Sequence, residues 1–181
     1  MQSQTRKLKY HVATTLDGFL AREDDSFDCF PNDPQAEHIT DYMATLQSAY
    51  DTVLMGRTTY EVGLKYGVTD PYPHLESYVF SRTMKETPNP RVRLVREDAL
   101  GFVRGLKARE GKDIYLCGGG PLAQPLFAEG LIDEVLIKLN PLLLGAGKGV
   151  APQLPRKVDL ELLSTKVYRS GVVLLRYEVK R

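Results

Sequence analysis

The stretch Leu116-Cys117-Gly118-Gly119-Gly120-Pro121-Leu122-Ala123 is the most informative part of this 181-residue sequence. An apolar segment that predicts a buried strand runs into three glycines, and a proline then opens a predicted helix. The first amides of a helix have no partner within it and lie at the positive end of its dipole, and glycines leave room for a phosphate to approach them. The stretch therefore predicts either a phosphate-binding turn or a tight turn that serves packing alone.

Two other predicted strands end in residues that suit phosphate binding. The apolar segment 53–55 is followed by Gly56, Arg57, Thr58 and Thr59, and the segment 78–80 is followed by Ser81 and Arg82. Arginine presents a planar set of donors that matches phosphate oxygens, although the threonines also serve as ordinary helix caps. Ligands of open α/β sheets bind at the carboxyl ends of strands, so three such ends together predict a dinucleotide site. The two arginines favour the form with a 2′-phosphate, NADPH.

Predicted strands and helices alternate along the chain as far as Leu139. Two further strand-like segments, 159–168 and 172–180, then flank the turn Arg169-Ser170-Gly171, which is a strong hairpin signal. This order predicts an α/β fold with a mostly parallel sheet, helices on both faces and an antiparallel C-terminal hairpin. The helix expected over residues 35–50 has Asp33 as its N-cap and Pro34 in its first turn. No linker-like segment divides the chain, so we expect one domain over residues 1–181.

Composition excludes several classes of function. The chain has 24 Lys and Arg against 23 Asp and Glu, which argues against a broad basic face for nucleic acid. Its two cysteines, Cys29 and Cys117, lie far apart and lack zinc spacing, so we expect free thiols and no metal site. No segment resembles a signal peptide or approaches the length that spans a bilayer, so the sequence predicts no membrane partner and a cytoplasmic location.

The ordered motifs resemble the dihydrofolate reductase superfamily, and most closely the riboflavin-pathway pyrimidine reductases. The resemblance rests on Thr15-Leu16-Asp17-Gly18-Phe19-Leu20-Ala21, Leu54-Met55-Gly56-Arg57-Thr58-Thr59-Tyr60-Glu61, Val79-Phe80-Ser81-Arg82 and Gly118-Gly119-Gly120-Pro121. It implies a three-layer α/β/α fold around a sheet of about eight strands and, often, a homodimer. The implied function is that of an NADPH-dependent reductase similar to 5-amino-6-(5-phosphoribosylamino)uracil reductase, with a small heterocyclic or ribosylamino substrate.

The resemblance also assigns the cofactor-binding residues. It places Ala13, Leu20 and Cys117 beside the nicotinamide, where Cys117 packs and is not a nucleophile. It assigns the pyrophosphate and adenosine phosphate to Gly56, Arg57, Thr58 and Thr59, and the 2′-phosphate to Ser81 and Arg82. The segment Gly118, Gly119, Gly120, Pro121 and Leu122 resembles the family's pyrophosphate loop.

Candidate catalytic and substrate-binding residues are less sharply defined by the sequence. Hydride transfer to a C=N or C=O group needs a positioned acceptor and a proton source. The resemblance implies a ring-orienting carboxylate on the helix that carries Glu37, His38 and Asp41; Asp41 is closest to that position, although strict spacing falls on Thr40. Asp17 is a hallmark of the pyrimidine reductase branch and a second catalytic candidate, through substrate binding. Glu37 and Lys148 are candidates for binding the substrate. Each has an alternative: Glu37 favours the helix dipole, Asp41 lies on a solvated helix face, Asp17 stabilises its turn, and Lys148 lies on an exposed loop.

Two alternative functions stay open. The first is dihydrofolate reduction, although Phe30-Pro31 stands where a folate enzyme is expected to carry tryptophan, and the chain has no Trp. The second is an NADPH-binding module without catalytic activity. An assay of NADPH oxidation with pteridine and ribosylaminopyrimidine substrates separates these functions.

Overall fold

The computed structural model describes residues 5–181 and contains one large central sheet. The strand order in this sheet is β5-β4-β3-β6-β1-β7-β10-β9. Its strands are β1 (Leu8–Thr15), β3 (Tyr50–Gly56), β4 (Glu76–Phe80), β5 (Val92–Val95), β6 (Asp113–Gly118), β7 (Glu134–Asn140), β9 (Leu160–Val167) and β10 (Val173–Val179). The strands from β5 to β7 are parallel, and β10 pairs antiparallel with both β7 and β9. The predicted mostly parallel sheet with a C-terminal antiparallel hairpin is therefore confirmed.

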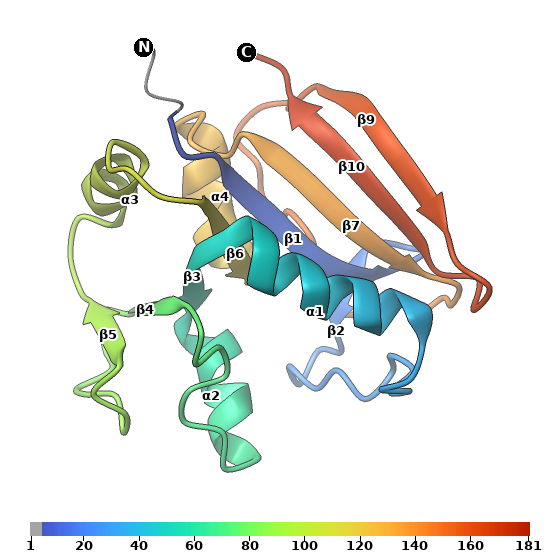
Figure 1. The fold of residues 1–181 in the computed structure, drawn as a ribbon, viewed down its shortest axis with the longest axis horizontal. Helices are drawn as coiled ribbons and strands as arrows, with labels where there is room; N and C mark the ends of the chain where they lie inside the picture. Colours follow the sequence, from blue (N-terminus) through green and yellow to red (C-terminus); the bar gives the residue numbers. More distant parts are fainter. Residues whose placement is uncertain (1–4) are drawn as a thin grey trace.

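Four helices cover the two faces of the sheet (Figure 1). They are α1 (Glu37–Ala49), α2 (Arg57–Lys65), α3 (Ala99–Lys107) and α4 (Gly120–Ala128). Alternation along β3 shows the layers, because Val53 belongs to the apolar cluster that contains residues of α1 and α2, whereas Leu54 belongs to the cluster that contains residues of α3 and α4. This is the α/β/α arrangement that the dihydrofolate-reductase-like resemblance implies.

The start of α1 differs from the prediction. The helix begins at Glu37 with Ala36 as its N-cap, not at Asp33 and Pro34. The Asp33 carboxylate accepts a hydrogen bond from the amide of Gln35 at 3.0 Å, and its carbonyl accepts from the amide of Ala36. Asp33 therefore closes a turn ahead of the helix, which satisfies its side chain before the first helical residue.

Two further features bear on the site. A two-stranded sheet that the sequence did not predict joins β2 (Phe19–Ala21) to β8 (Lys148–Gly149), so the candidate Lys148 lies beside the turn of Asp17.

Helix α4 contains Pro125 in its interior and still begins at Gly120. Its starting point at the glycine turn is therefore preserved.

Candidate functional site

The first turns of α2 and α4 lie side by side at the carboxyl ends of β3 and β6. Their N-cap residues are Gly56 and Gly119, and neither helix start has a side-chain cap. A Cβ atom at Gly56 would lie 3.5 Å from the Gly119 amide nitrogen and 3.7 Å from the Gly118 carbonyl oxygen. Two uncapped sets of helix amides, distant in sequence, therefore meet at one point, which suits an anion.

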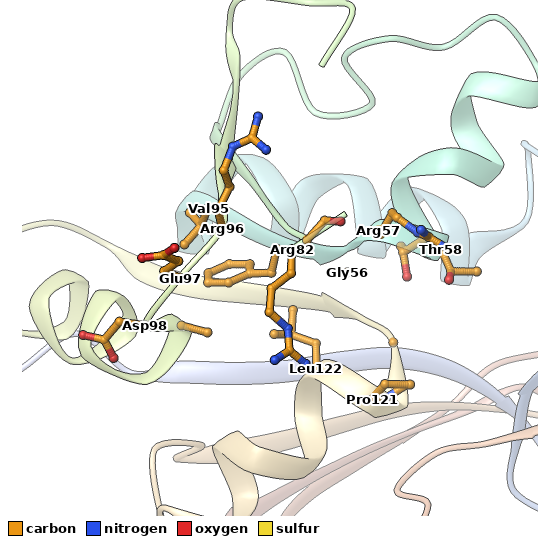
Figure 2. Close-up of a pocket in the computed structure, with 15 residues that line it drawn as sticks. Gly56, Arg57, Thr58, Arg82, Val95, Arg96, Glu97, Asp98, Pro121 and Leu122 are labelled. Carbon is orange, nitrogen blue, oxygen red and sulfur yellow. The ribbon is translucent and has the colours of Figure 1, made fainter. Parts of the chain in front are cut away.

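A pocket of about 480 Å³ opens beside these two helix starts (Figure 2). It extends from α2 and α4 to the ends of β4 and β5. The residues assigned to the cofactor from sequence that line it are Gly56, Arg57, Thr58, Thr59, Ser81, Arg82, Gly119, Pro121 and Leu122. The structure thus brings together the three strand ends that the sequence singled out.

The two arginines of the pocket differ in their contacts. Figure 2 shows Arg82 reaching across the pocket toward Leu122, and within residues 5–181 its guanidinium takes part in no salt bridge. Arg57 donates from Nη1 to the Thr83 hydroxyl at 2.8 Å, and its Nε lies 3.5 Å from a Glu61 carboxylate oxygen. Arg57 is therefore held in place, whereas Arg82 keeps its donors for a ligand.

Sequence reasoning missed one wall of the pocket. This wall follows β5 and consists of Phe80 from β4 together with Val95, Arg96, Glu97, Asp98 and Ala99. Asp98 accepts from the Gly101 amide at 2.9 Å and so caps α3. Arg96 points away from the pocket in Figure 2 and donates to the Met84 and Lys85 carbonyl oxygens. This wall could have been expected, because β5 is a fourth parallel strand. Its carboxyl end lies at the same edge of the sheet as those of β3, β4 and β6.

The other residues of the glycine turn act through packing. A Cβ atom at Gly120 would lie 2.6 Å from Pro152 Cδ and 3.0 Å from the Gly149 carbonyl oxygen. Gly118 has a φ of 133°, a conformation that favours glycine. The packing role that the sequence left open is therefore present at Gly118 and Gly120, and Gly119 lines the pocket.

The residues expected near the nicotinamide lie outside this pocket. Ala13 is in β1, and Leu20 packs against the apolar cluster of α3 and α4. The Cys117 sulfur lies 3.1 Å from the Tyr72 hydroxyl. Burial raises the pKa of the Cys117 thiol, which keeps it protonated, in accord with a packing role.

Asp17 is engaged with backbone groups. Its carboxylate accepts from the Thr15 hydroxyl at 2.6 Å and from the amides of Leu144 and Gly145. The Thr15 and Gly145 hydrogen bonds lower the pKa of Asp17 to about 2. These contacts favour the turn-stabilising alternative, because they tie residue 17 to the loop that leads to Lys148. The ammonium of Lys148 lies 3.7 Å from an Asp25 carboxylate oxygen.

Asp41 and Glu37 project from α1 toward the C-terminal hairpin. Asp41 accepts from the ammonium of Lys166 and, at 3.0 Å, from the Tyr168 hydroxyl. The Lys166 hydrogen bond is the main cause of the lowered pKa of Asp41. Glu37 lies 3.6 Å from the Lys166 ammonium. Asp41 lines a second hollow, of about 250 Å³, which shares no lining residue with the first pocket.

The described residues offer neither a metal-binding cluster nor a membrane-spanning helix. Residues 5–181 hold no group of three or more His, Cys, Asp or Glu side chains placed to bind a metal ion. No helix within the same range has the length and apolar character needed to cross a membrane.

Comparison with known proteins agrees with the geometry. Residues 6–174 match the family described as the RibD C-terminal domain. The chain is 31% identical over 183 residues to the uncharacterized protein YyaP of Bacillus subtilis, covering 95% of this chain and 94% of that protein. A solved structure of a putative riboflavin biosynthesis protein from Shewanella sp. PV-4 is similar with a TM-score of 0.81 and 27% identity, covering 98% of this chain and all of that one.

The fold also matches a folate enzyme. Dihydrofolate reductase from Enterococcus faecalis, solved with NADP(H), gives a TM-score of 0.71 at 15% identity, and 97% of each chain is covered. At this identity the likeness concerns the fold.

Proposed function

The chain belongs to the RibD C-terminal domain family, and from that membership we propose that it is an NADPH-dependent reductase. Its substrate is a small heterocyclic or ribosylamino compound, as for 5-amino-6-(5-phosphoribosylamino)uracil reductase. One observation carries the proposal: two uncapped helix starts and two arginines meet in one pocket at the carboxyl edge of the sheet. That combination suits a phosphorylated dinucleotide more than a single phosphate.

The pocket residues favour one orientation of bound NADPH. The pyrophosphate fits between Gly56 and Gly119, where backbone amides of both helix starts are available. The 2′-phosphate fits near Arg82 and Ser81, with Arg57 as a second cation. Glu97 and Asp98 line the opposite wall and repel phosphate, which favours the arginine side for that group.

The reaction needs hydride transfer, which NADPH supplies, and a bound acceptor. We assign the nicotinamide end to Ala13, Leu20 and Cys117 on the strength of the family resemblance. On the substrate side, Asp41 and Glu37 are the proposed orienting carboxylates. Asp17 is a proposed positioning residue, because its carboxylate holds the backbone of the loop that carries Lys148.

The proposal is tested with Arg82→Ala and two nucleotides. Loss of a charge-assisted contact to the 2′-phosphate predicts at least about tenfold weaker NADPH binding, and no more than about a twofold change for NADH. Fluorescence titration of both nucleotides measures this. Arg104→Ala is the matched control, because the Arg104 guanidinium pairs with Glu129 outside the pocket, so both affinities should stay unchanged.

Two results would count against this function. Equal weakening of NADPH and NADH by Arg82→Ala contradicts the phosphate role of Arg82. NADPH binding without turnover of any pteridine or ribosylaminopyrimidine substrate favours the binding-module alternative.

We also propose that the chain forms a homodimer through β9. This strand is the edge of the sheet, all eight of its residues are exposed, and it carries Leu160, Leu162, Leu163 and Val167. An antiparallel pair of β9 strands centred between residues 163 and 164 places Glu161 opposite the partner's Lys166. The register of β9 on β10 puts both side chains on the same face of the sheet. The same arrangement places Leu160 opposite the partner's Val167, so one charged pair and one apolar pair are matched across the strands.

Light scattering after size exclusion tests the dimer. The expected mass is twice the 20.3 kDa of one chain. Leu162→Lys should give a monomer, because it places a charge in the apolar part of the paired strands. Leu143→Lys changes a more exposed leucine outside β9 and should stay dimeric. A monomeric wild type at tens of micromolar overturns the proposal.

The two cysteines bear on the cellular compartment of the protein. Cys29 and Cys117 are unpaired, which suits a reducing compartment such as the cytoplasm. We propose a single reductase domain over residues 1–181, since one sheet carries the residues of both ligand sites.

A further inference from the structure

The second hollow lies between one flank of α1 and the sheet face of β1, β7, β10 and β9. We call it the α1 hollow. Its chemically active side chains come from four parts of the chain: His11, His38, Asp41, Lys138, Lys166 and Tyr168. The remaining lining includes Leu174 and the hydroxyls of Thr45 and Ser48, which donate to carbonyl oxygens of α1. The proposed cofactor pocket shares none of these residues.

Lys138 is the unusual group of the α1 hollow. It lies on β7 opposite Ala13 of β1, and its ammonium lies 5.6 Å from the centre of the Tyr42 ring. Within residues 5–181 it forms no salt bridge, and burial alone lowers the pKa of its ammonium. The aromatic contact offsets only part of the desolvation of a cation. The charge of Lys138 is therefore uncompensated in the protein.

The other titratable groups leave this charge in excess. Lys166 is paired with Asp41, and Glu37 lies near the same ammonium. His11 is buried, and burial lowers its pKa to about 4, so the ring is neutral at neutral pH. Burial also lowers the pKa of His38, whose Nδ1 lies 3.2 Å from the Ser170 hydroxyl. The interior of the α1 hollow thus presents one unmatched positive charge and several donors.

We propose that the α1 hollow binds the oxyanion of a small molecule, a phosphoryl or carboxylate group, with Lys138 as its principal cation. An oxyanion compensates the half-buried ammonium and accepts its hydrogen bonds. The volume of about 250 Å³ is several times the roughly 30 Å³ that one water occupies in the liquid. It leaves room for a phosphoryl group with a short carbon chain. Because Asp41 lines the α1 hollow and is also a proposed orienting carboxylate, this inference rests on the substrate side of the proposed function, whereas its test needs only phosphate binding.

Calorimetric titration with inorganic phosphate at constant ionic strength tests this site. Lys138→Met keeps the apolar stem over Tyr42 and removes the charge, and should weaken phosphate at least tenfold. Lys157→Met removes an exposed lysine outside the α1 hollow and should leave phosphate binding unchanged. Thermal melting and NADPH affinity, both expected to match the wild type, verify that Lys138→Met is folded.

Arg57→Ala separates the two sites, because phosphate also fits the cofactor pocket. Phosphate binding that survives in Arg57→Ala and is lost in Lys138→Met supports the proposal. Binding lost in Arg57→Ala and kept in Lys138→Met overturns it, as does the absence of saturable binding up to tens of millimolar. Failure of NADPH binding in the wild type would instead sink the proposed function and leave this test intact.

A second titration identifies the source of the oxyanion. Glycerol 3-phosphate is compared with inorganic phosphate in the Arg57→Ala background. If glycerol 3-phosphate binds at least tenfold more tightly than inorganic phosphate, the natural ligand is a molecule that ends in a phosphomonoester. If the two bind equally, the natural ligand is a free anion. Either result supports the α1 hollow as an oxyanion site if Lys138→Met abolishes it.

Discussion

The cofactor pocket and the α1 hollow are built in different ways. The pocket lies at the carboxyl ends of parallel strands, and backbone amides of α2 and α4 form its centre. The α1 hollow lies over the middle of strands, and side chains from β7, β9 and α1 form it. A strand-end site is encoded in short contiguous motifs. A site over the middle of a sheet depends on the register of strands far apart in sequence.

The two sites also differ in how their positive charge is maintained. In the cofactor pocket it comes from helix starts and from Arg57 and Arg82, whose guanidinium groups stay charged when partly desolvated. In the α1 hollow it comes from Lys138, where burial disfavours the charged form of the ammonium and so lowers its pKa. Substitutions that disturb backbone packing at the helix starts should therefore harm the cofactor pocket alone, and removal of the Lys138 charge should harm the α1 hollow alone.

The largest effect is expected from Gly120→Ala, which tests the dependence of the cofactor pocket on backbone packing. The added Cβ meets the Pro152 ring at 2.6 Å and the Gly149 carbonyl oxygen at 3.0 Å, so the start of α4 must shift. Overpacking of this kind costs about 1–3 kcal/mol of unfolding free energy. We expect weaker NADPH binding as well, while phosphate binding in the α1 hollow persists. Urea unfolding and the two titrations measure these effects.

Gly105→Ala is the control for this substitution. Gly105 lies inside α3, and a Cβ atom there has no neighbour within 4 Å. The change should stabilise the protein by about 0.5–1 kcal/mol, since alanine is the better helix former. If both variants lose equal stability, the explanation from close contact at Gly120 is wrong.

Much of the fold could be predicted because its signals are local. The glycine turn at 118–120, the arginine-bearing strand ends and the turn at Ser170 each lie in a few consecutive residues. Right-handed crossovers between parallel strands then leave few arrangements for such an order of elements. The eight-stranded sheet and its hairpin followed from these segments.

What the sequence did not reveal depends on tertiary pairing. The start of α1 at Glu37 results from a turn in which the Asp33 carboxylate accepts from the Gln35 amide and so does not cap the helix. The pairing of β2 with β8 joins residues about 130 apart, and neither segment is long enough to be recognised alone. Lys138 was not singled out, because its place between β1 and β10 is fixed only by register. Side-chain chemistry in mid-sheet therefore needs the structure.

The smallest effect is expected from Asp41→Asn, which changes the charge of the α1 hollow while keeping its shape. Removing a carboxylate beside the site should tighten phosphate a few-fold, the size expected for charges near a protein surface. NADPH affinity should stay within about twofold, because Asp41 does not line the cofactor pocket. Calorimetry and fluorescence titration measure the two affinities.

The pH dependence of stability gives Asp41→Asn a second readout. The pKa of Asp41 is lowered in the folded protein by Lys166 and Tyr168, so the carboxylate stabilises the fold above its unfolded value of 3.8 and loses this contribution as the pH falls below it. The melting temperatures of wild type and variant should differ by no more than about 3 °C at pH 7 and converge in acid. Asp159→Asn, which removes an exposed partner of Lys157, should leave phosphate binding unchanged. Weaker phosphate binding in Asp41→Asn would mean that this carboxylate organises the α1 hollow, and that charge compensation of Lys138 does not govern the site.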